Sequence, residues 1–291
     1  MLLPVHRAAA PDPDAWLRMN PHLVADWLVA FLKDECTRKR GVKKVVIGLS
    51  GGVDSAVSTY LAVRAFGAEN VNVFMLPYKL SSSASLEHAE LCVKELGISS
   101  RVIDITNMVD GYLAGFESEA NATRIGNVCA RCRALILFDQ AAKIGGLPIG
   151  TGNKTERFFG YYTWHADDSP PLNPLGDLFK TQVWAVARAL GVPSVIVDKP
   201  PTADLVKGQT DEGDFGISYH RADQILSRHV AGISRERIIR DGFEPAEVDL
   251  VIKKVAGTHW KRHMPTVAML SDTAINEYYL RPVDYLAIPT R

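Results

Sequence analysis

Short apolar runs recur along the first half of the chain. Four of them are closed by polar or turn-forming residues: KKVVIGL (43–49), VNVFMLP (71–77), RVIDIT (101–106) and LPIGTGN (147–153). Unbroken apolar runs of this length are typical of strands that are covered on both faces of a parallel sheet. The pattern therefore predicts four buried parallel strands.

Helical spacing of apolar residues fills the segments around these runs. It predicts helices over 55–66, 83–96 and 125–144, and a further helix over about 20–39 ahead of the first strand. Strands that alternate with helices require right-handed crossovers, which predicts an α/β fold with a doubly wound parallel sheet and flanking helices. In the third helix, the residues expected on one apolar face are Ala130, Ala134, Leu137, Phe138 and Ala141.

The helix predicted over 20–39 carries Leu23, Trp27, Leu28 and Phe31 on one side. We expect this side to pack on the sheet, and a contact between two copies of the chain is the alternative. The 291 residues, of which 47% are apolar, can build one substantial core, so a single domain over 1–291 is expected. After residue 150 the chain is rich in loops, and long loops in a compact domain are usually functional or mobile.

Composition excludes several classes of protein. Lys plus Arg and Asp plus Glu both number 33, so the basic excess typical of nucleic-acid binders is absent. No run of 18 apolar residues predicts a membrane span, and the first residues lack the pattern of a signal peptide. Four cysteines are few for this length, which favours a reduced, cytoplasmic protein.

The segment IGLSGGVDS (47–55) lies between a predicted strand and a predicted helix. Unpaired amides at a helix N-terminus bind anions, and glycine lets a phosphate approach them closely. Ser50 and Ser55 add hydroxyl donors, whereas the carboxylate of Asp54 would repel a phosphate unless a cation lay between them. The segment thus predicts a phosphate site with a divalent ion, Mg²⁺.

Two familiar phosphate loops do not match this segment, because it has neither the Gly-Lys of a Walker A loop nor the G-x-G-x-x-G of a dinucleotide fingerprint. A purely structural Gly-rich turn is the alternative. The pattern Ser-Gly-Gly-x-Asp-Ser resembles the N-type ATP pyrophosphatases. In that superfamily the loop holds the pyrophosphate part of ATP while the α-phosphate is attacked and an adenylate forms.

Four later segments extend the resemblance: 126–142, 150–163, 173–193 and 199–219. Together with the loop they resemble the ammonia-dependent NAD synthetases over roughly residues 20–270. The resemblance implies an adenine nucleotide alpha hydrolase-like fold, amidation of deamido-NAD with ammonia at the expense of ATP, and a homodimer with the dinucleotide at its interface. A glutaminase domain is not expected, because it would need about 250 further residues.

The resemblance also implies roles for individual residues. ATP is expected on Thr151, Lys180 and Thr202 and on the loop, whose residues are Gly48, Leu49, Ser50, Gly51, Gly52, Val53, Asp54 and Ser55. Asp54 and Glu156 are the expected Mg²⁺ ligands. With Lys180, which we expect near the phosphates, the ion would neutralise the departing pyrophosphate.

Deamido-NAD is expected to contact Arg133 and Lys261. Trp164 and Trp260 replace polar residues that the family often has, and stacking on a ring of the substrate is expected instead. Asp167 or Asp168 is our candidate for taking a proton from ammonium, with an ordinary solvated loop as the alternative.

Two other functions stay open. A tRNA-modifying sulfur transferase would need a reactive cysteine, and Cys129 and Cys132 form a C-x-x-C, but the pair lies in a predicted helix, where small packing residues are expected. The other is a nucleotide-binding module without activity.

His259 and His263 have no evident third metal ligand. Residues 80–86 and 203–215 are expected to lack core residues and to become ordered when ATP binds.

Overall fold

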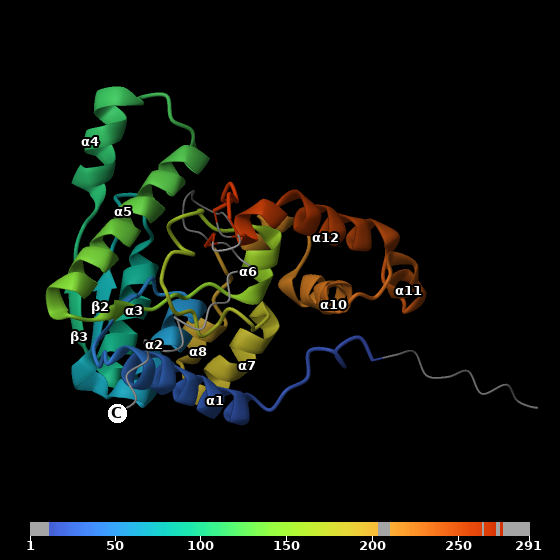
Figure 1. Ribbon diagram of the computed structural model, residues 1–291, viewed down its shortest axis with the longest axis horizontal. Helices are drawn as coiled ribbons and strands as arrows, with labels where there is room; N and C mark the ends of the chain where they lie inside the picture. Colours follow the sequence, from blue (N-terminus) through green and yellow to red (C-terminus); the bar gives the residue numbers. More distant parts are fainter. Residues whose placement is uncertain (1–11, 203–209, 264, 272–273, 276–291) are drawn as a thin grey trace, which may run out of the picture.

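The computed structural model describes residues 12–202, 210–263, 265–271 and 274–275, and shows a parallel sheet between two layers of helices (Figure 1). The strands are β1 (Val45–Gly48), β2 (Val71–Met75), β3 (Ser99–Val102) and β4 (Leu147–Pro148). The helices are α1 (Pro21–Lys33), α2 (Val53–Phe66), α3 (Ser83–Leu96), α4 (Thr106–Phe116), α5 (Ala122–Ile144), α6 (Lys154–Phe159), α7 (Lys180–Leu190), α8 (Ser194–Val197), α9 (Asp211–Phe215), α10 (Tyr219–Val230), α11 (Arg235–Arg240) and α12 (Pro245–Gly257). A π-helix, η1 (Asp34–Arg38), continues α1, and two 3₁₀-helices, η2 (Ala68–Asn70) and η3 (His259–Arg262), complete the described elements.

The sheet confirms the predicted α/β class. Its described strands follow the order β3-β2-β1-β4, and every pairing is parallel. The chain runs outward from β1 to β3 on one side and then returns to place β4 on the other, so the order reverses between β1 and β4. In doubly wound sheets, the carboxyl ends of the strands at such a reversal are the usual ligand site.

Two strand predictions need correction. The run at 101–106 was expected to be a buried strand, but β3 covers Ser99–Val102 and all of its residues are exposed. It is an edge strand of the described sheet, and its Ser-Ser-Arg start tolerates water. The run at 147–153 supplies only the two residues of β4, because the chain leaves the sheet to form a loop at 150–153.

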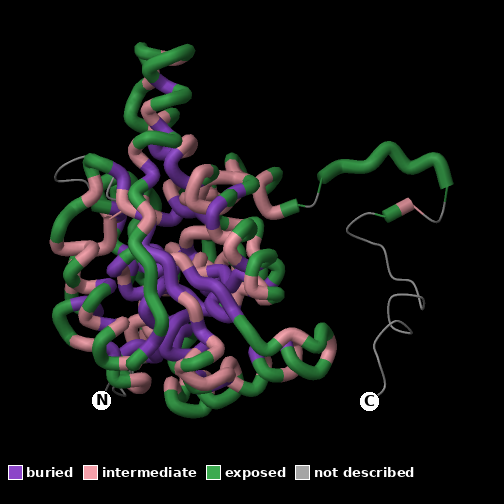
Figure 2. Tube along the Cα trace, turned by 90° about the vertical axis from the view of Figure 1, so that its left-hand side faces the viewer, coloured by how far each residue is buried: buried purple, intermediate pink, exposed green. Residues whose placement is uncertain are grey.

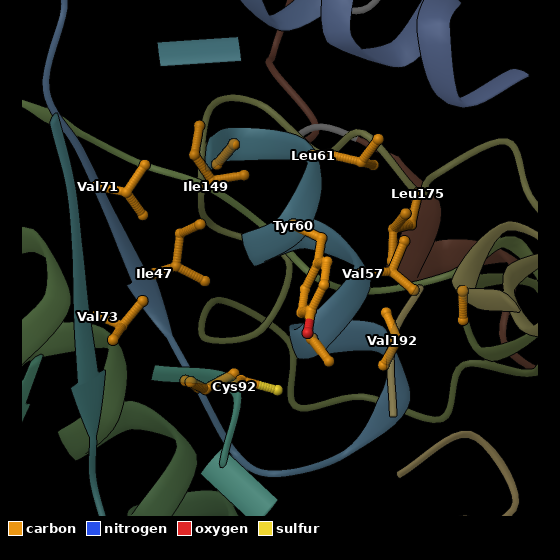
Figure 3. Packing of buried hydrophobic residues seen from close by; sticks show 14 of the residues in the cluster. Ile47, Val57, Tyr60, Leu61, Val71, Val73, Cys92, Ile149, Leu175 and Val192 are labelled. Atoms are coloured by element: carbon orange, nitrogen blue, oxygen red, sulfur yellow. The ribbon is translucent and has the colours of Figure 1, made fainter. Parts of the chain in front are cut away.

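The two faces of the sheet carry separate apolar clusters, set by the alternation of side chains along β1. Val45 and Ile47 point to one face, where they pack with α2, α3 and α7, while Val46 joins α4 and α5 on the other. On the first face Ile47 and Val73 lie opposite Val57 and Tyr60 of α2 (Figure 3). Buried residues therefore run through the middle of the molecule, with exposed ones around it (Figure 2).

The N-terminal helix is present, and the side chain of Asn20 caps it by accepting from the amides of His22 and Leu23. It packs on α2 and α7 rather than directly on the sheet, so that part of the prediction is wrong. Ala25 and Leu32 are buried, whereas Leu23 and Trp27 are 67% and 71% exposed.

A third apolar cluster, which the sequence patterns did not predict, joins α6 to α9, α10, α11 and α12. Phe159, Phe215 and Tyr219 meet there edge to face. Of these, α10, α11 and α12 lie on the far side of the molecule from α4 and the sheet (Figure 1).

Residues 80–86 and 203–215 were expected to lack core residues, and this is wrong where they are described. Leu86 packs on the first cluster and Phe215 is buried in the third. Residues 203–209 lie outside the described residues.

Candidate active site

A cavity of about 680 Å³, the main cavity, opens where β1 and β4 end. Its size falls in the ordinary range for small-molecule sites. It is bordered by the loops that follow the two strands, by α5 and by the segments around α6 and α9. Among the expected site residues, those that line it are Gly48, Leu49, Ser50, Gly52, Val53, Asp54, Ser55, Arg133, Thr151, Glu156, Asp167, Asp168, Lys180, Thr202 and Lys261.

The loop after β1 is held in shape by its own hydroxyl groups. The Oγ atoms of Ser50 and Ser55 are 3.0 Å apart, the Ser50 amide donates to Ser55 Oγ over 3.2 Å, and Ser55 Oγ donates to the carbonyl of Gly52 over 3.0 Å. Gly52 is the residue before the first turn of α2. The first amides of α2 therefore border the main cavity, as an anion site requires.

Gly51 has a different role from the one expected. It does not line the main cavity, and it has a left-handed φ of 77°. A Cβ atom there would lie 1.9 Å from the backbone carbonyl oxygen of Ser85, so glycine is required by the close approach of α3. Gly52 is the glycine that faces the main cavity.

A buried charged cluster forms the floor of the main cavity. Lys180, at the start of α7, places its Nζ in an ion pair with Asp54 and 3.4 Å from Glu156 Oε1. The lysine side chain is only 3% exposed. The amide side chain of Asn153 donates to Asp54 over 2.9 Å, and Asn153 and Glu156 cap the start of α6 reciprocally. Side chains from the starts of three helices, α2, α6 and α7, thus meet in one cluster.

Burial and charge act in opposite directions in this cluster. Burial raises the pKa of Glu156 to about 7, with Lys180 opposing the rise and Asp54 adding to it. Burial alone would lower the pKa of Lys180, but the charges of Asp54 and Glu156 outweigh it and the pKa is raised. The lysine is therefore a permanent cation, and a further cation beside the two acids would favour their ionised forms.

Asp211 and Lys199 are charged residues of the main cavity that were not assigned from the sequence. Asp211, in the first turn of α9, is 5% exposed and accepts from the hydroxyl of Tyr219 over 2.9 Å, and burial raises its pKa. Its other oxygen, Oδ1, is buried with no partner among the described residues. Lys199 donates to Ser85 Oγ over 3.0 Å and brings a further cation to the lining.

Helix α5 forms one wall of the main cavity. Three residues of its predicted apolar face line this cavity: Ala134, Leu137 and Phe138. Arg133 lines it too, and its Nε donates to the carbonyl of Leu76 over 3.0 Å. Arg131 instead donates to the carbonyl of Trp164.

Lys261, on η3, reaches the main cavity from the opposite end of the chain. Its Nζ donates to the carbonyls of Gly160 and Tyr162 over 2.8 and 2.7 Å, and burial lowers its pKa. The Tyr162 hydroxyl donates back to the Lys261 carbonyl over 2.6 Å. These bonds join η3 to the loop after α6.

Asp167 and Asp168 lie in that loop, between the main cavity and a smaller one of about 270 Å³. Asp167 accepts from the amide of Thr163 over 2.8 Å, and loss of water around its carboxylate raises its pKa. Asp168 Oδ1 is buried without a partner among the described residues. The bond from Thr163 fixes the Asp167 carboxylate although that residue is exposed, whereas Asp168 is half-buried.

Trp164 and Trp260 do not line the main cavity, and their contact with the substrate stays a prediction. Their rings meet edge to face with centroids 5.2 Å apart, and the ring centroid of Trp164 lies 4.0 Å from that of His165. Trp260 is still 49% exposed. The indoles tie η3 to the loop that carries Asp167.

The remaining chemistry-bearing residues are structural in the described chain. Cys129 and Cys132 pack in the cluster of α4 and α5, as predicted, and burial raises the pKa of both thiols. His259 and His263 are exposed, with ring centroids 6.2 Å apart.

The described residues hold no group of three or more His, Cys, Asp or Glu side chains placed to bind a metal. Within the same residues, no helix has the length and apolar character needed to cross a bilayer.

Comparison with known proteins decides the family. The sequence model of the NAD synthase family matches residues 24–265. This chain belongs to the NAD synthase family. It is 46% identical over 258 residues to the NH(3)-dependent NAD(+) synthetase of Chlorobaculum parvum, which covers 88% of this chain and 92% of the relative. The enzyme of the same name from Trichlorobacter lovleyi is 43% identical, over 89% of this chain and 95% of the relative.

Solved structures of NAD synthase relatives share the fold. The NH3-dependent NAD synthetase of Campylobacter jejuni is similar at a TM-score of 0.74 and 27% identity, over 86% of this chain and all of that one. The NMN synthetase of Francisella tularensis is similar at 0.76 and 29%, over 88% of this chain and all of that one. The parallel sheet with flanking helices is therefore the family's fold.

Proposed function

We propose that this protein amidates deamido-NAD with ammonia, consuming ATP and giving NAD, AMP and pyrophosphate. The observation that carries the proposal is the placement of Lys180 Nζ between Asp54, from the Ser-Gly-Gly-x-Asp-Ser segment, and Glu156, from the first turn of α6. This cluster lies beside the first amides of α2 in the main cavity. The family and the names of its relatives agree with this reaction.

In the first step, the substrate carboxylate attacks the α-phosphorus of ATP and the bond to pyrophosphate breaks. Negative charge grows on the leaving oxygens, so fixed positive charge lowers the barrier. Lys180 and the amides before α2 supply that charge. We expect the rest of the ATP site from Thr151 and Thr202, which line the same cavity.

The residues fit a magnesium ion as well. Mg²⁺ commonly binds through one or two carboxylates plus phosphate oxygens. Asp54 and Glu156 share the single ammonium of Lys180, so the two carboxylates can offer oxygen ligands to one further cation. When bound, the ion would screen the pyrophosphate from these two acids.

In the second step, ammonia attacks the adenylated carbonyl and AMP leaves. Asp167 or Asp168 takes the proton from ammonium, since both line the main cavity and each carries a carboxylate that can accept it. Arg133 and Lys261 orient deamido-NAD. Trp164 and Trp260 remain our candidates for stacking on a ring of the substrate, and their contact with each other supports this loop.

The reaction is tested by measuring products from purified protein. We expect NAD, AMP and pyrophosphate in equal amounts, only when deamido-NAD, ATP, magnesium and ammonium are all present. Asp54→Asn should reduce the rate at least about 100-fold, because it removes one negative ligand and the partner of Lys180. Product from nicotinate mononucleotide but not from deamido-NAD would assign the chain to the activity named for the Francisella tularensis relative.

The same assay tests the alternatives. Nothing favours tRNA sulfur transfer, because both thiols of the C-x-x-C have pKa values raised by burial. That activity would require tRNA and would be lost in Cys132→Ser. A binding module without activity would hold ATP but release no pyrophosphate.

We further propose that the active form is a homodimer joined through α4 and α5. Exposed apolar side chains gather there, including Met108, Tyr112, Phe116 and Leu135. The patch continues into the main cavity through Phe138, so a second copy would complete the dinucleotide site. Leu135→Glu should give sedimentation at the 31.9 kDa of one chain, while Trp27→Glu on α1 leaves the dimer intact.

We also infer one synthetase domain over 1–291 and a cytoplasmic location. The described cysteines are all free thiols, which a reducing compartment preserves. Localisation of a tagged copy in the cell of origin checks the second inference.

A further inference from the structure

Asp223 is a fully buried acid on α10 that the reaction above does not use. Its exposed fraction is 0%, and it does not line the main cavity. Burying a carboxylate is costly unless hydrogen bonds replace its water. Asp223 Oδ1 accepts from Thr155 Oγ1 over 2.6 Å, and Oδ2 accepts from the amide and the hydroxyl of Thr181 over 2.9 and 2.8 Å.

These two threonines are the immediate neighbours of the charged cluster. Thr155 precedes Glu156 on α6, and Thr181 follows Lys180 on α7. Thr155 Oγ1 also accepts from the amide of Lys180 over 3.0 Å. One carboxylate thus joins the first turns of two helices, each of which carries one partner of the ion pair between Lys180 and Glu156.

Hydrogen bonds and a nearby cation offset part of the cost of burying the Asp223 carboxylate. Burial raises its pKa to about 6, while the bonds from Thr155 and Thr181 and the charge of Lys180 oppose the rise. An anion at a helix N-terminus is stabilised by the helix dipole. Asp223 is therefore ionised near neutral pH and bonded to both helices.

We infer that Asp223 is a positioning residue for the adenylation step: through Thr155 and Thr181 it fixes the start of α7 against the start of α6, and so fixes Lys180 Nζ against Glu156 and Asp54. The inference rests on the proposed function. Misplacement of a charged group by about 1 Å can cost about 100-fold in rate, even when the altered residue is remote from the reacting atoms.

The test uses variants that break and keep the link. Thr155→Val removes the shared hydroxyl at constant shape, and Asp223→Asn removes the charge. Both should lower kcat per folded molecule about 10- to 100-fold. KM for deamido-NAD should stay within about threefold, because Arg133 and Lys261 have no bond to Asp223. Thr155→Ser keeps the hydroxyl and should restore kcat.

Ser227→Ala is the matched control, since it removes a buried hydroxyl from the same helix that bonds only to the carbonyl of Gln224. It should lower thermal stability without changing kcat per folded molecule. The inference is overturned if Thr155→Val and Asp223→Asn also keep the wild-type kcat per folded molecule, or if Thr155→Ser is as impaired as Thr155→Val. Failure of the wild-type protein to make NAD would instead refute the proposed function.

Discussion

At the scale of single residues, Glu156 combines burial with a functional charge, and this costs stability. Its pKa rises from 4.5 to about 7 on folding, so the folded protein holds the proton more tightly than the unfolded chain does. The stabilisation that this tighter proton binding adds to the free energy of unfolding is complete below pH 4.5 and is lost as the pH rises through 7. Glu156→Gln cannot ionise, and without magnesium it should be about 1–3 kcal/mol more stable than wild type at pH 8.

Urea unfolding with a chelator, at pH 5 and pH 8, measures this difference. Near pH 5 the difference should be much smaller than at pH 8, because Glu156 of the folded wild-type protein is then largely protonated. A difference that does not change with pH would contradict the assignment of the raised pKa to Glu156. The same variant should lose most of its activity, since Lys180 and the proposed magnesium ion lose a ligand.

At the scale of elements, the contact between the β1–α2 loop and α3 depends on Gly51. Gly51→Ala would place a Cβ atom 1.9 Å from the Ser85 carbonyl oxygen and would also strain a φ of 77°. We expect a loss of about 2–4 kcal/mol in stability and at least a 10-fold fall in pyrophosphate release. Gly97→Ala is the matched control, because its φ is 61° but nothing lies within 4 Å of the added Cβ atom.

Thermal unfolding and the pyrophosphate assay on both variants distinguish the effect of the strained φ from the effect of the clash with the Ser85 carbonyl. Gly97→Ala should lose only about 1 kcal/mol, from the strained φ alone, and should keep its activity. Equal losses in the two variants would show that the approach of Ser85 has no part in the effect.

Elements also show how far sequence patterns reach. Asp54 was predicted from the Ser-Gly-Gly-x-Asp-Ser segment at the start of a helix, whereas the roles predicted for Glu156 and Lys180 came from the resemblance to the NAD synthetases. Asn153 could have been found, since Asn with Glu three residues later is a capping-box pattern. Asp223 could not, because Thr155 and Thr181 are tens of residues away along the chain, and neither could Asp211, because only the fold places it near Lys180.

The errors have a common physical origin. Apolar periodicity shows which face of a helix avoids water, but not whether a core, a cavity or a second chain covers that face. Leu23 and Trp27 of α1 are exposed, although they were expected to pack on the sheet. On the predicted apolar face of α5, Leu137 packs on the cluster of α4 and α5 and also lines the main cavity with Phe138. For β3, position at the edge of the sheet outweighed its apolar character.

At the scale of the whole molecule, the main cavity lies between groups that belong to different apolar clusters. Arg133 lies on α5, beside the sheet, whereas Glu156 and Asp211 lie on the helices that pack in the third cluster. A nucleotide bound there would bridge the two parts and stabilise both against unfolding. At 100 times its dissociation constant, a ligand adds about 2.7 kcal/mol, which for a chain of this size corresponds to a rise of about 5–8 °C in Tm.

Differential scanning fluorimetry with ATP and magnesium measures that rise. Asp54→Asn should remove most of it, because the ion and the phosphates lose their shared site, while Trp27→Glu on the exposed side of α1 should show the full rise. An undiminished rise in Asp54→Asn would place the triphosphate away from residues 48–55. A rise without magnesium equal to that with it would mean that Lys180 and the helix amides hold the phosphates unaided, and that the two acids need no further cation.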